Sequence, residues 1–302
     1  VYAPNGSGKT SISLMLKSLC DNTSISAKKT FDSEEPTIIK LMGSDKKEFS
    51  YNGNRWNRNY KYMEIFNSFY LEDNVYTISI EDKENELNIL EMSAQEEARK
   101  LRNKLNGKNK SLSIVRKRIK NRKTRLRKEN KDFNKDGMCI QLEEKRKKLM
   151  KEQKKLFEER NAFLEPLVNN YIANINRYLS SFSNDLKIID QKIVRPKNSN
   201  EIKLIYGIKI NNHKIHFNER ETAEGHSLKY YLSEGDKNAL ALSFFLAKMD
   251  MVPNPEKYVI VIDDPFTSFD THRKQTTITQ LVRMAHKVGQ MFILTHDLHF
   301  AN

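Results

Sequence analysis

Residues 3–10, which read A-P-N-G-S-G-K-T, constrain the fold more than any other part of the sequence. The small residues let the backbone curl so that several N–H groups point toward one anion. Lys9 can then reach the β- and γ-phosphates of a nucleotide, and the hydroxyl of Thr10 can bind Mg²⁺. The pattern is typical of a phosphate-binding loop, although Ala3 stands where glycine is usual. The residues expected to hold nucleotide at this loop are Asn5, Gly6, Ser7, Gly8, Lys9, Thr10 and Ser11.

The segment after this loop predicts a helix. Residues 11–19 read S-I-S-L-M-L-K-S-L, and the positive end of such a helix would face the phosphates. A strand, a glycine-rich loop and a helix in this order begin an α/β fold. A glycine-rich turn before an ordinary helix would look the same locally, so motifs further along the chain decide between the two interpretations.

The composition indicates a modest core with something long and solvated attached. Hydrophobic residues make up 38% of the 302 residues and charged residues 30%. There is no apolar run long enough to span a bilayer and no signal peptide, which argues against a membrane protein. Cys20 and Cys139 are too few and too far apart for a disulfide framework, so we expect a reducing cytoplasm. Residues 1–3 resemble the tail of a buried strand, and we expect the chain to be a fragment at both ends.

The positive charge of the chain is concentrated in one segment. The formal net charge is +14, from 53 Lys and Arg residues and 39 Asp and Glu residues. Residues 97–160 contain 25 of the basic and nine of the acidic residues, a local charge of +16. That leaves 28 basic and 30 acidic residues elsewhere, so the whole excess belongs to this segment.

The basic segment has the apolar spacing of a coiled coil. Apolar residues recur at intervals of three, four and seven, with turn residues at 132–137 between two runs. We expect an antiparallel helical hairpin over residues 91–182, with an arm about 60 Å long. Lys108 and Arg122 fall at seam positions that would otherwise be apolar. The first run consists of Leu101, Leu105, Leu112, Val115, Ile119 and Leu126, and the second of Leu142, Leu149, Leu156 and Phe163.

The charge of this predicted arm has two interpretations. A coiled-coil surface normally mixes both signs, whereas basic residues here outnumber acidic ones by nearly three to one. Such a surface suits binding to the phosphate backbone of DNA or RNA without base readout. Solvation, or contact with an acidic protein, is the alternative. Cys139 is a single cysteine near the tip, so a zinc hook is not expected.

A second motif supplies carboxylates. Residues 258–264 read Y-V-I-V-I-D-D, an apolar β-branched run typical of a buried parallel strand. Asp263 would lie at the edge beside the phosphate loop, where it can hold Mg²⁺ together with Thr10. Asp264 can then orient or deprotonate an attacking water. The alternative is a core strand that ends in an acidic turn with a structural role alone.

Three further motifs resemble those of ATP-binding-cassette (ABC) ATPases. Residues 232–237 (L-S-E-G-D-K) precede an apolar helix and resemble the signature, which implies that Ser233 and Gly235 contact the γ-phosphate held by another subunit. Residues 265–270 (P-F-T-S-F-D), ending in Asp270, resemble the D-loop at the dimer interface. Residues 291–297 (M-F-I-L-T-H-D) resemble a strand that ends in the switch histidine, His296.

The order of the motifs narrows the resemblance. Residues 11–231, including the predicted arm, separate the phosphate loop from the signature, as in the SMC/RecF/RecN branch of the ABC ATPases. The residues of these motifs are most similar to those of bacterial AAA-family ATPases of the RloC/PrrC anticodon-nuclease type. Two departures are visible: the usual catalytic glutamate is Asp264, and no Q-loop glutamine is evident. Asn67 is our substitute for that glutamine.

The remaining segments predict additional strands. Residues 47–56 and 60–66 resemble strands around an Asn-Gly turn. Their aromatic residues alternate with Arg and Lys and could stack on bases, but one buried face of a sheet is the favoured interpretation. Residues 186–189, 202–210 and 214–217 suggest a second antiparallel group.

These motifs together predict an α/β ABC-type ATPase head with an inserted helical arm. Residues 1–90 and 183–302 would form the head, and residues 91–182 the arm. Two heads would sandwich two ATP molecules with Mg²⁺, and Lys9, Asp264 and His296 would serve hydrolysis. The expected roles are the gating of an effector nuclease or toxin in phage defence, a DNA-repair or chromosome-associated ATPase, or an ATP-dependent dimerisation switch without turnover. A transporter ATPase is disfavoured, since a long basic arm has no role there.

Overall fold

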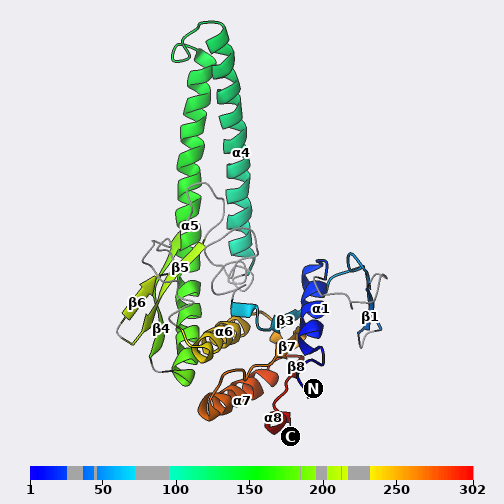
Figure 1. Ribbon diagram of the computed structural model, residues 1–302. Coiled ribbons are helices and arrows are strands. Elements are labelled where there is room, and N and C mark those ends of the chain that lie inside the picture. Colours follow the sequence, from blue (N-terminus) through cyan, green and yellow to red (C-terminus); the bar gives the residue numbers. More distant parts are fainter. Residues whose placement is uncertain are drawn as a thin grey trace. The chain divides into compact units, whose positions relative to one another are not determined.

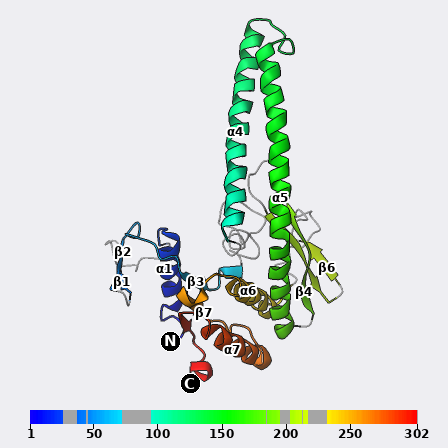
Figure 2. The ribbon, with the colours of Figure 1, turned by 180° about the vertical axis from the view of Figure 1, so that it is seen from behind.

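The computed structural model describes residues 1–25, 37–43, 46–71, 95–183, 185–194, 203–211, 213–216 and 232–301. The chain divides into two compact units. The first unit comprises Val1–Thr77, Ile175–Ile188 and Ile208–Asn302, and the second comprises Ile78–Asn174 and Ile189–Gly207. Figures 1 and 2 show the elements of both units from opposite sides.

A parallel sheet forms the centre of the first unit. Its order is β3 (Met63–Phe66), β7 (Val259–Asp263) and β8 (Gln290–Leu294). Tyr2 adds a parallel bridge to Thr295, so the residues that lead into the phosphate loop lie beside the end of β8. The middle strand, β7, is buried, as the apolar run before Asp263 predicts. Like most strands of parallel sheets, it is covered on both faces. The carboxyl ends of β3, β7 and β8 therefore share one edge with the start of α1 (Lys9–Asp21).

Two longer helices follow the signature and D-loop segments. Helix α6 (Glu234–Met249) is buried around most of its circumference, in keeping with its apolar sequence. Helix α7 (Thr271–Ala285) is amphipathic, with Thr277, Leu281 and Met284 buried. A 3₁₀ turn, η3 (Pro255–Lys257), precedes β7, and the short α8 (Leu298–Ala301) follows β8.

A small aromatic lobe packs against the C-terminal half of α1. It contains the antiparallel hairpin of β1 (Ile38–Met42) and β2 (Glu48–Asn52). Phe49, Tyr51 and Trp56 form a core cluster with Leu19 of α1, so the favoured interpretation of these aromatics as a buried face is correct.

The expected pairing around the Asn-Gly turn is wrong. The strand before the turn, β2, pairs with β1, and the chain beyond the turn returns to β2 through the bridge between Tyr51 and Trp56 without forming a second strand there. The second expected strand becomes β3 and joins the parallel sheet beside β7. An alternating pattern marks a strand but does not specify its partner.

The third sheet has the order β4 (Leu186–Val194), β5 (Lys203–Ile210) and β6 (His213–His216). Leu204, Tyr206 and Ile208 of its central strand are buried. These strands occupy the segments that the sequence predicts after the helical region.

Two long helices dominate the second unit. Helix α4 (Gln95–Lys128) and helix α5 (Gly137–Phe182) are joined through residues 129–136, and both views show them side by side. Leu112, Val115 and Ile119 of α4 form a buried cluster with Leu149 of α5, and Leu142 packs against it. Along the described residues, no helix combines the length and apolar character needed to cross a membrane.

The polar positions between these helices differ from the sequence-based expectation by one residue. Asn109, not Lys108, is buried between the leucines, and its side-chain oxygen accepts a hydrogen bond from Gln153. Lys108 lies at the edge, where its ammonium is 2.5 Å from Glu152. Arg122 is likewise half-buried and pairs with Asp136 at 2.7 Å. Long basic side chains keep their charge near water while their stems cover apolar surface, which explains the shift.

Candidate functional site

The phosphate loop has the backbone of an anion cradle. Gly6 and Gly8 have φ of 81° and 89°, a left-handed conformation that side chains with a Cβ rarely adopt. Nothing lies within 4 Å of the place a Cβ would occupy on either residue, so it is the backbone conformation, not close packing, that favours glycine here. Gly8 is the N-cap of α1, and the unpaired N–H groups of the first turn add a partial positive charge. The loop can therefore receive a phosphate.

Lys9 is held at this loop by its own backbone. Its side chain is 9% exposed, and the ammonium donates to the carbonyl oxygens of Ala3 at 2.7 Å and Pro4 at 3.0 Å. Both acceptors are neutral. A phosphate oxygen is a stronger partner for the ammonium because it carries charge. The lysine is thus positioned to exchange a carbonyl for a nucleotide phosphate.

Asp263 meets the first turn of α1 at the end of β7. The carboxylate is 5% exposed and accepts a hydrogen bond from Ser13 at 3.0 Å, with the Thr10 hydroxyl also interacting with it. Burial raises the pKa of Asp263, while the hydroxyls of Thr10 and Ser13 and the charge of Lys9 act in the opposite direction.

These residues fit a magnesium ion. The second carboxylate oxygen of Asp263, Oδ1, is buried with no hydrogen-bond partner in the described part of the chain. Across the described ranges, no cluster of three or more His, Cys, Asp and Glu side chains is arranged to hold a metal. Mg²⁺ does not require such a cluster, because it commonly binds one or two protein oxygens together with phosphate oxygens and water.

Asp264 and His296 form a pair beside Asp263. The Nδ1 of His296 lies 2.5 Å from Oδ2 of Asp264, and the two side chains are 39% and 23% exposed, respectively. Asp264 has φ of 53°, and its N–H donates to the carbonyl of Leu294 at 2.8 Å. Left-handed backbone is costly for most residues but tolerated by Asp and Asn, so an aspartate suits this position at the end of β7. The geometry brings together the two residues predicted to act on water and on the γ-phosphate.

Asn67 lies at the same edge of the sheet. It directly follows β3, in which Phe66 is in register with Ile262, so Asn67 is placed next to Asp263. The side chain is 3% exposed and accepts a hydrogen bond from the N–H of Phe69 at 3.1 Å. Its amide nitrogen is buried without a hydrogen-bond partner among the described residues. This amide N–H group can therefore donate to an attacking water or to a phosphate oxygen, whereas a metal contact would have to use Oδ1.

The signature segment begins α6 with a capped turn. Ser233 is the N-cap: its hydroxyl accepts from the N–H of Asp236 at 3.1 Å and donates to the Asp236 carboxylate at 2.7 Å. Gly235 is required by close packing, since a Cβ there would lie 2.9 Å from the carbonyl oxygen of Ser268 and 2.7 Å from Arg273. Asn238 donates to the carbonyl of Thr267 at 2.7 Å. The signature is thus bound to the D-loop of its own chain.

Two residues that sequence reasoning missed join these motifs. Arg273 of α7 donates to Asp236 at 2.7 Å and to the carbonyl of Phe182, the last residue of α5, at 3.1 Å. Lys274 donates to Asp297, which follows His296, at 2.7 Å. The first turn of α7 therefore links the signature, the end of α5 and the switch segment. Only their position just after the D-loop could have pointed to them.

The other predicted residues have simpler surroundings. Asp270 caps α7, with its carboxylate accepting from the N–H of Arg273 at 2.8 Å, so its observed role is a helix cap. Ser7 donates to the carbonyl of Pro4 at 2.7 Å and helps to close the loop. Asn5 and Ser11 are exposed. The structure thus gathers Lys9, Thr10, Asn67, Asp263, Asp264 and His296 at one edge, whereas Ser233, Gly235 and Asp270 belong to the signature and D-loop contact.

A comparison with protein families matches one part of the chain. A family described as an AAA domain matches residues 212–302. That stretch contains the signature, the carboxylate strand, the D-loop and His296. The match covers less than half of the chain, and it supports an ATPase role for this part of the protein. Among curated proteins, no match was found.

Solved structures give loose likenesses over most of the chain. An Smc head domain with an extended coiled coil from Pyrococcus furiosus, bound to the C-terminal domain of ScpA, is 16% identical with a TM-score of 0.44, covering 88% of this chain and 67% of that one. An Smc head bound to the C-winged helix domain of ScpA is 13% identical, with a TM-score of 0.47 and coverages of 97% and 80%. The recombination mediator protein RecF with ATP is 20% identical, with a TM-score of 0.43 and coverages of 97% and 86%.

Proposed function

We propose that this chain is an ATP-binding and ATP-hydrolysing head of the ABC type, related to the SMC and RecF proteins. The observation that carries the proposal is the buried Asp263, which meets the first turn after the phosphate loop through Ser13 and Thr10. Lys9 lies at the same loop, and the Asp264–His296 pair directly follows on the sheet edge. Few sites other than one for a nucleoside triphosphate need this combination.

The residues of the site divide the chemistry among them. The loop N–H groups and Lys9 bind the β- and γ-phosphates and stabilise the negative charge that develops on them. A bound Mg²⁺, held through Thr10 and Asp263, neutralises further phosphate charge. Asp264 orients the attacking water and accepts its proton, for which His296 must release Oδ2. His296 then contacts the γ-phosphate.

The signature supports an ATP-dependent homodimer. Ser233 is exposed at the N-terminus of α6, where N–H groups can receive an anion. Within its own chain this segment contacts the D-loop and Arg273. A γ-phosphate bound by a second copy would satisfy the exposed helix end. We therefore propose that two heads close around two ATP molecules.

The basic surface of the arm is the part of the chain best suited to bind a partner. Its acidic residues Glu129, Asp136, Glu143 and Glu152 are each within an ion pair, so they neutralise only the basic residues beside them. Many other Lys and Arg side chains of α4 and α5 are exposed. Nucleic acid bound there would regulate ATP hydrolysis by the head. In a phage-defence role, the head would in turn activate an effector such as a tRNA-cutting domain. In a DNA-repair role, the same arm would bind DNA and no effector would be needed. The likeness to the RloC/PrrC type stays a prediction.

A second candidate function is a switch that binds ATP without useful turnover. The observation that favours it is the carboxylate after Asp263: Asp264 is one methylene shorter than the usual glutamate and is engaged by His296 at 2.5 Å. A base in this state reaches water less readily. Binding and dimerisation would then be the whole activity.

One assay separates these functions. The protein is incubated with Mg-ATP, with and without duplex DNA or tRNA, at two salt concentrations, and released phosphate and dimer fraction are measured. Turnover that nucleic acid stimulates, and that fades with salt, supports an ATPase regulated through the arm. Dimerisation with no turnover supports the switch. If the protein does not bind Mg-ATP, both functions are overturned. In that case Lys9→Ala and the control variant Lys257→Ala would behave alike.

A further inference from the structure

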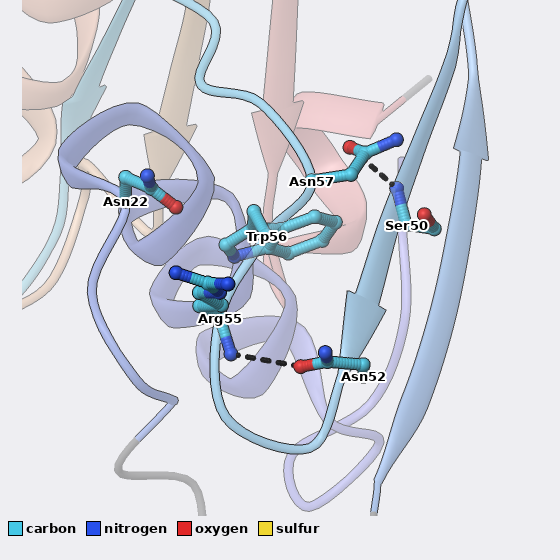
Figure 3. A pocket seen from close by; sticks show the side chains of 6 residues that line it. All are labelled: Asn22, Ser50, Asn52, Arg55, Trp56 and Asn57. Carbon is cyan, nitrogen blue, oxygen red and sulfur yellow. Dashed lines mark hydrogen bonds between the residues drawn. The ribbon is translucent and has the colours of Figure 1, made fainter.

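A polar pocket lies in the aromatic lobe, away from the phosphate loop. It has a volume of about 440 Å³ and is lined by Asn22, Ser50, Asn52, Arg55, Trp56 and Asn57 (Figure 3). This volume is in the range of small-ligand sites. The lining holds three amides, a hydroxyl, a guanidinium and an indole, without a carboxylate. Such a set can donate and accept hydrogen bonds and can pair with a negative charge.

The pocket is separate from the predicted ATP site. Asn22 is the C-cap of α1, and Gly8, in the phosphate loop, is the N-cap of the same helix. The helix has 13 residues, so the two ends are about 20 Å apart. A ligand in the pocket would therefore not be the nucleotide at Lys9.

Three residues in the pocket are held in place by the fold. Asn57 accepts from the N–H of Ser50 at 3.1 Å and holds the loop against β2. Asn52 accepts from the N–H of Arg55 at 3.1 Å, which fixes the backbone of the following turn. Trp56 is 2% exposed, and its indole N–H donates to Ser18 at 3.0 Å. These contacts form the wall of the pocket before any ligand arrives.

Two other side chains are available to a ligand. Asn22 is exposed, with φ of 51°, and its amide faces the interior in Figure 3. Arg55 is exposed and belongs to none of the ion pairs found among the described residues. One therefore offers a neutral donor and acceptor, and the other a planar cation.

The surroundings of the pocket favour an anionic ligand. The described residues in the ranges 21–25 and 37–62 include six basic side chains and two acidic side chains, Asp21 and Glu48. The carbonyl groups at the C-terminal end of α1 carry partial negative charge, which disfavours an anion beside Asn22. An anionic group would therefore lie toward Arg55, and an uncharged hydrogen-bonding group toward Asn22. The basic side chains are Lys40, Lys46, Lys47, Arg55, Arg58 and Lys61.

We propose that this pocket binds one nucleotide of a single-stranded nucleic acid, with the base edge at Asn22 and the phosphate at Arg55. Amide side chains match the donor and acceptor pattern of base edges, and arginine binds phosphate through two parallel hydrogen bonds. Bases of single strands are accessible for such contacts, whereas those of a duplex are stacked inside it. The site is additional to the basic arm and does not require hydrolysis of ATP.

Trp56 provides a direct test, because it is the one tryptophan in the sequence. Its emission, excited at a wavelength that nucleic acids do not absorb, is followed while oligo(dT), oligo(rA) or free AMP is added to the full chain without ATP. We expect saturable quenching by the oligonucleotides. Quenching by AMP at similar concentrations would assign the site to a free nucleotide, and absence of any change would overturn the proposal.

Matched variants locate the signal. Arg55→Met and Asn22→Gly, which keeps the left-handed backbone of residue 22, should each weaken oligonucleotide binding about tenfold while leaving the emission maximum of the free protein unchanged. Arg58→Met removes an equal charge from a residue that packs over Phe49 and should have little effect. Equal losses for Arg55→Met and Arg58→Met would show non-specific attraction and refute the pocket. Lys9→Ala should leave the quenching intact, so failure of this test and failure of the ATPase proposal remain distinguishable.

Discussion

The edge of the parallel sheet and the helical arm use charge in opposite ways. At the edge, a few ionised groups are partly or wholly buried, and each faces a specific partner: Asp263 meets Ser13, and Asp264 meets His296. On the arm, the 24 basic residues between 100 and 160 lie mostly on exposed surface, and ion pairs among the described residues involve only some of them. Buried charges depend on exact geometry and are weakly screened, whereas exposed charges act collectively and fade with salt. Single substitutions should therefore matter greatly at the edge and little on the arm.

The largest effect is expected at the phosphate loop. Lys9→Ala removes the ammonium from the carbonyls of Ala3 and Pro4 and from the phosphates it would bind. We expect ATP hydrolysis to fall at least about a hundredfold, because a group that stabilises charge in the transition state contributes on that scale. Phosphate release and ATP binding measure the effect. Asp263→Asn should match it, and a variant that keeps normal turnover would disprove the site.

Substitution of Asp264 comes next. Asp264→Asn keeps the shape and is compatible with φ of 53°, so the backbone should not change. We expect turnover to fall by about a hundredfold or more from loss of the general base, with ATP binding retained. Size-exclusion chromatography with ATP should show an accumulated dimer. Normal hydrolysis by Asp264→Asn would remove Asp264 from the mechanism.

Arg273 tests whether the signature depends on its support. Arg273→Met loses the hydrogen bonds to Asp236 and to the carbonyl of Phe182. We expect turnover to fall about tenfold with unchanged ATP affinity, since the lysine and the carboxylates are untouched. Arg283→Met, an exposed position on the same helix, is the control. Equal activity of the two variants would limit Arg273 to a structural contact.

The arm should give the smallest effect for each residue. Lys147→Gln removes one exposed charge, and we expect affinity for duplex DNA to fall only a few-fold. The slope of log affinity against log salt should decrease by about one for each phosphate contact that is lost. Fluorescence anisotropy over a salt series measures both quantities. A loss of function from one arm residue as large as that of Lys9→Ala would contradict the contrast between the sheet edge and the arm. No loss of DNA affinity after several lysines are replaced together would contradict it as well.

The parts of this fold that follow local rules could be predicted. The loop at residues 3–10, the strand that ends at Asp263 and the strand that ends before His296 each carry their signal in consecutive residues. The contacts of Arg273 could not be predicted, because its partners at 182 and 236 are distant in sequence. Ser13 was within reach, since it follows Thr10 by three residues and therefore lies on the same face of α1.

The arm shows that the spacing of apolar residues does not specify which neighbouring polar residue is buried. Intervals of three, four and seven identify the helices, but they leave open whether residue 108 or 109 lies inside. The partner helix decides: Gln153 accommodates Asn109, and Glu152 draws Lys108 to the edge. The pairing of β3 with β7 was hidden for a similar reason, since the residues on either side of a turn need not pair with each other.

The polar pair between the two long helices sets the register of the hairpin. Leu142, Leu149 and Leu156 repeat every seven residues, so a slip by one heptad would leave leucines facing leucines. The same slip would separate Asn109 from Gln153 and Lys108 from Glu152, and it would place Arg146 or Arg160 opposite Asn109. The leucines hold the helices together in several alignments, and the polar residues select one. The Asn109–Gln153 hydrogen bond and the Lys108–Glu152 ion pair therefore favour the alignment in which residues 129–136 form the connecting turn.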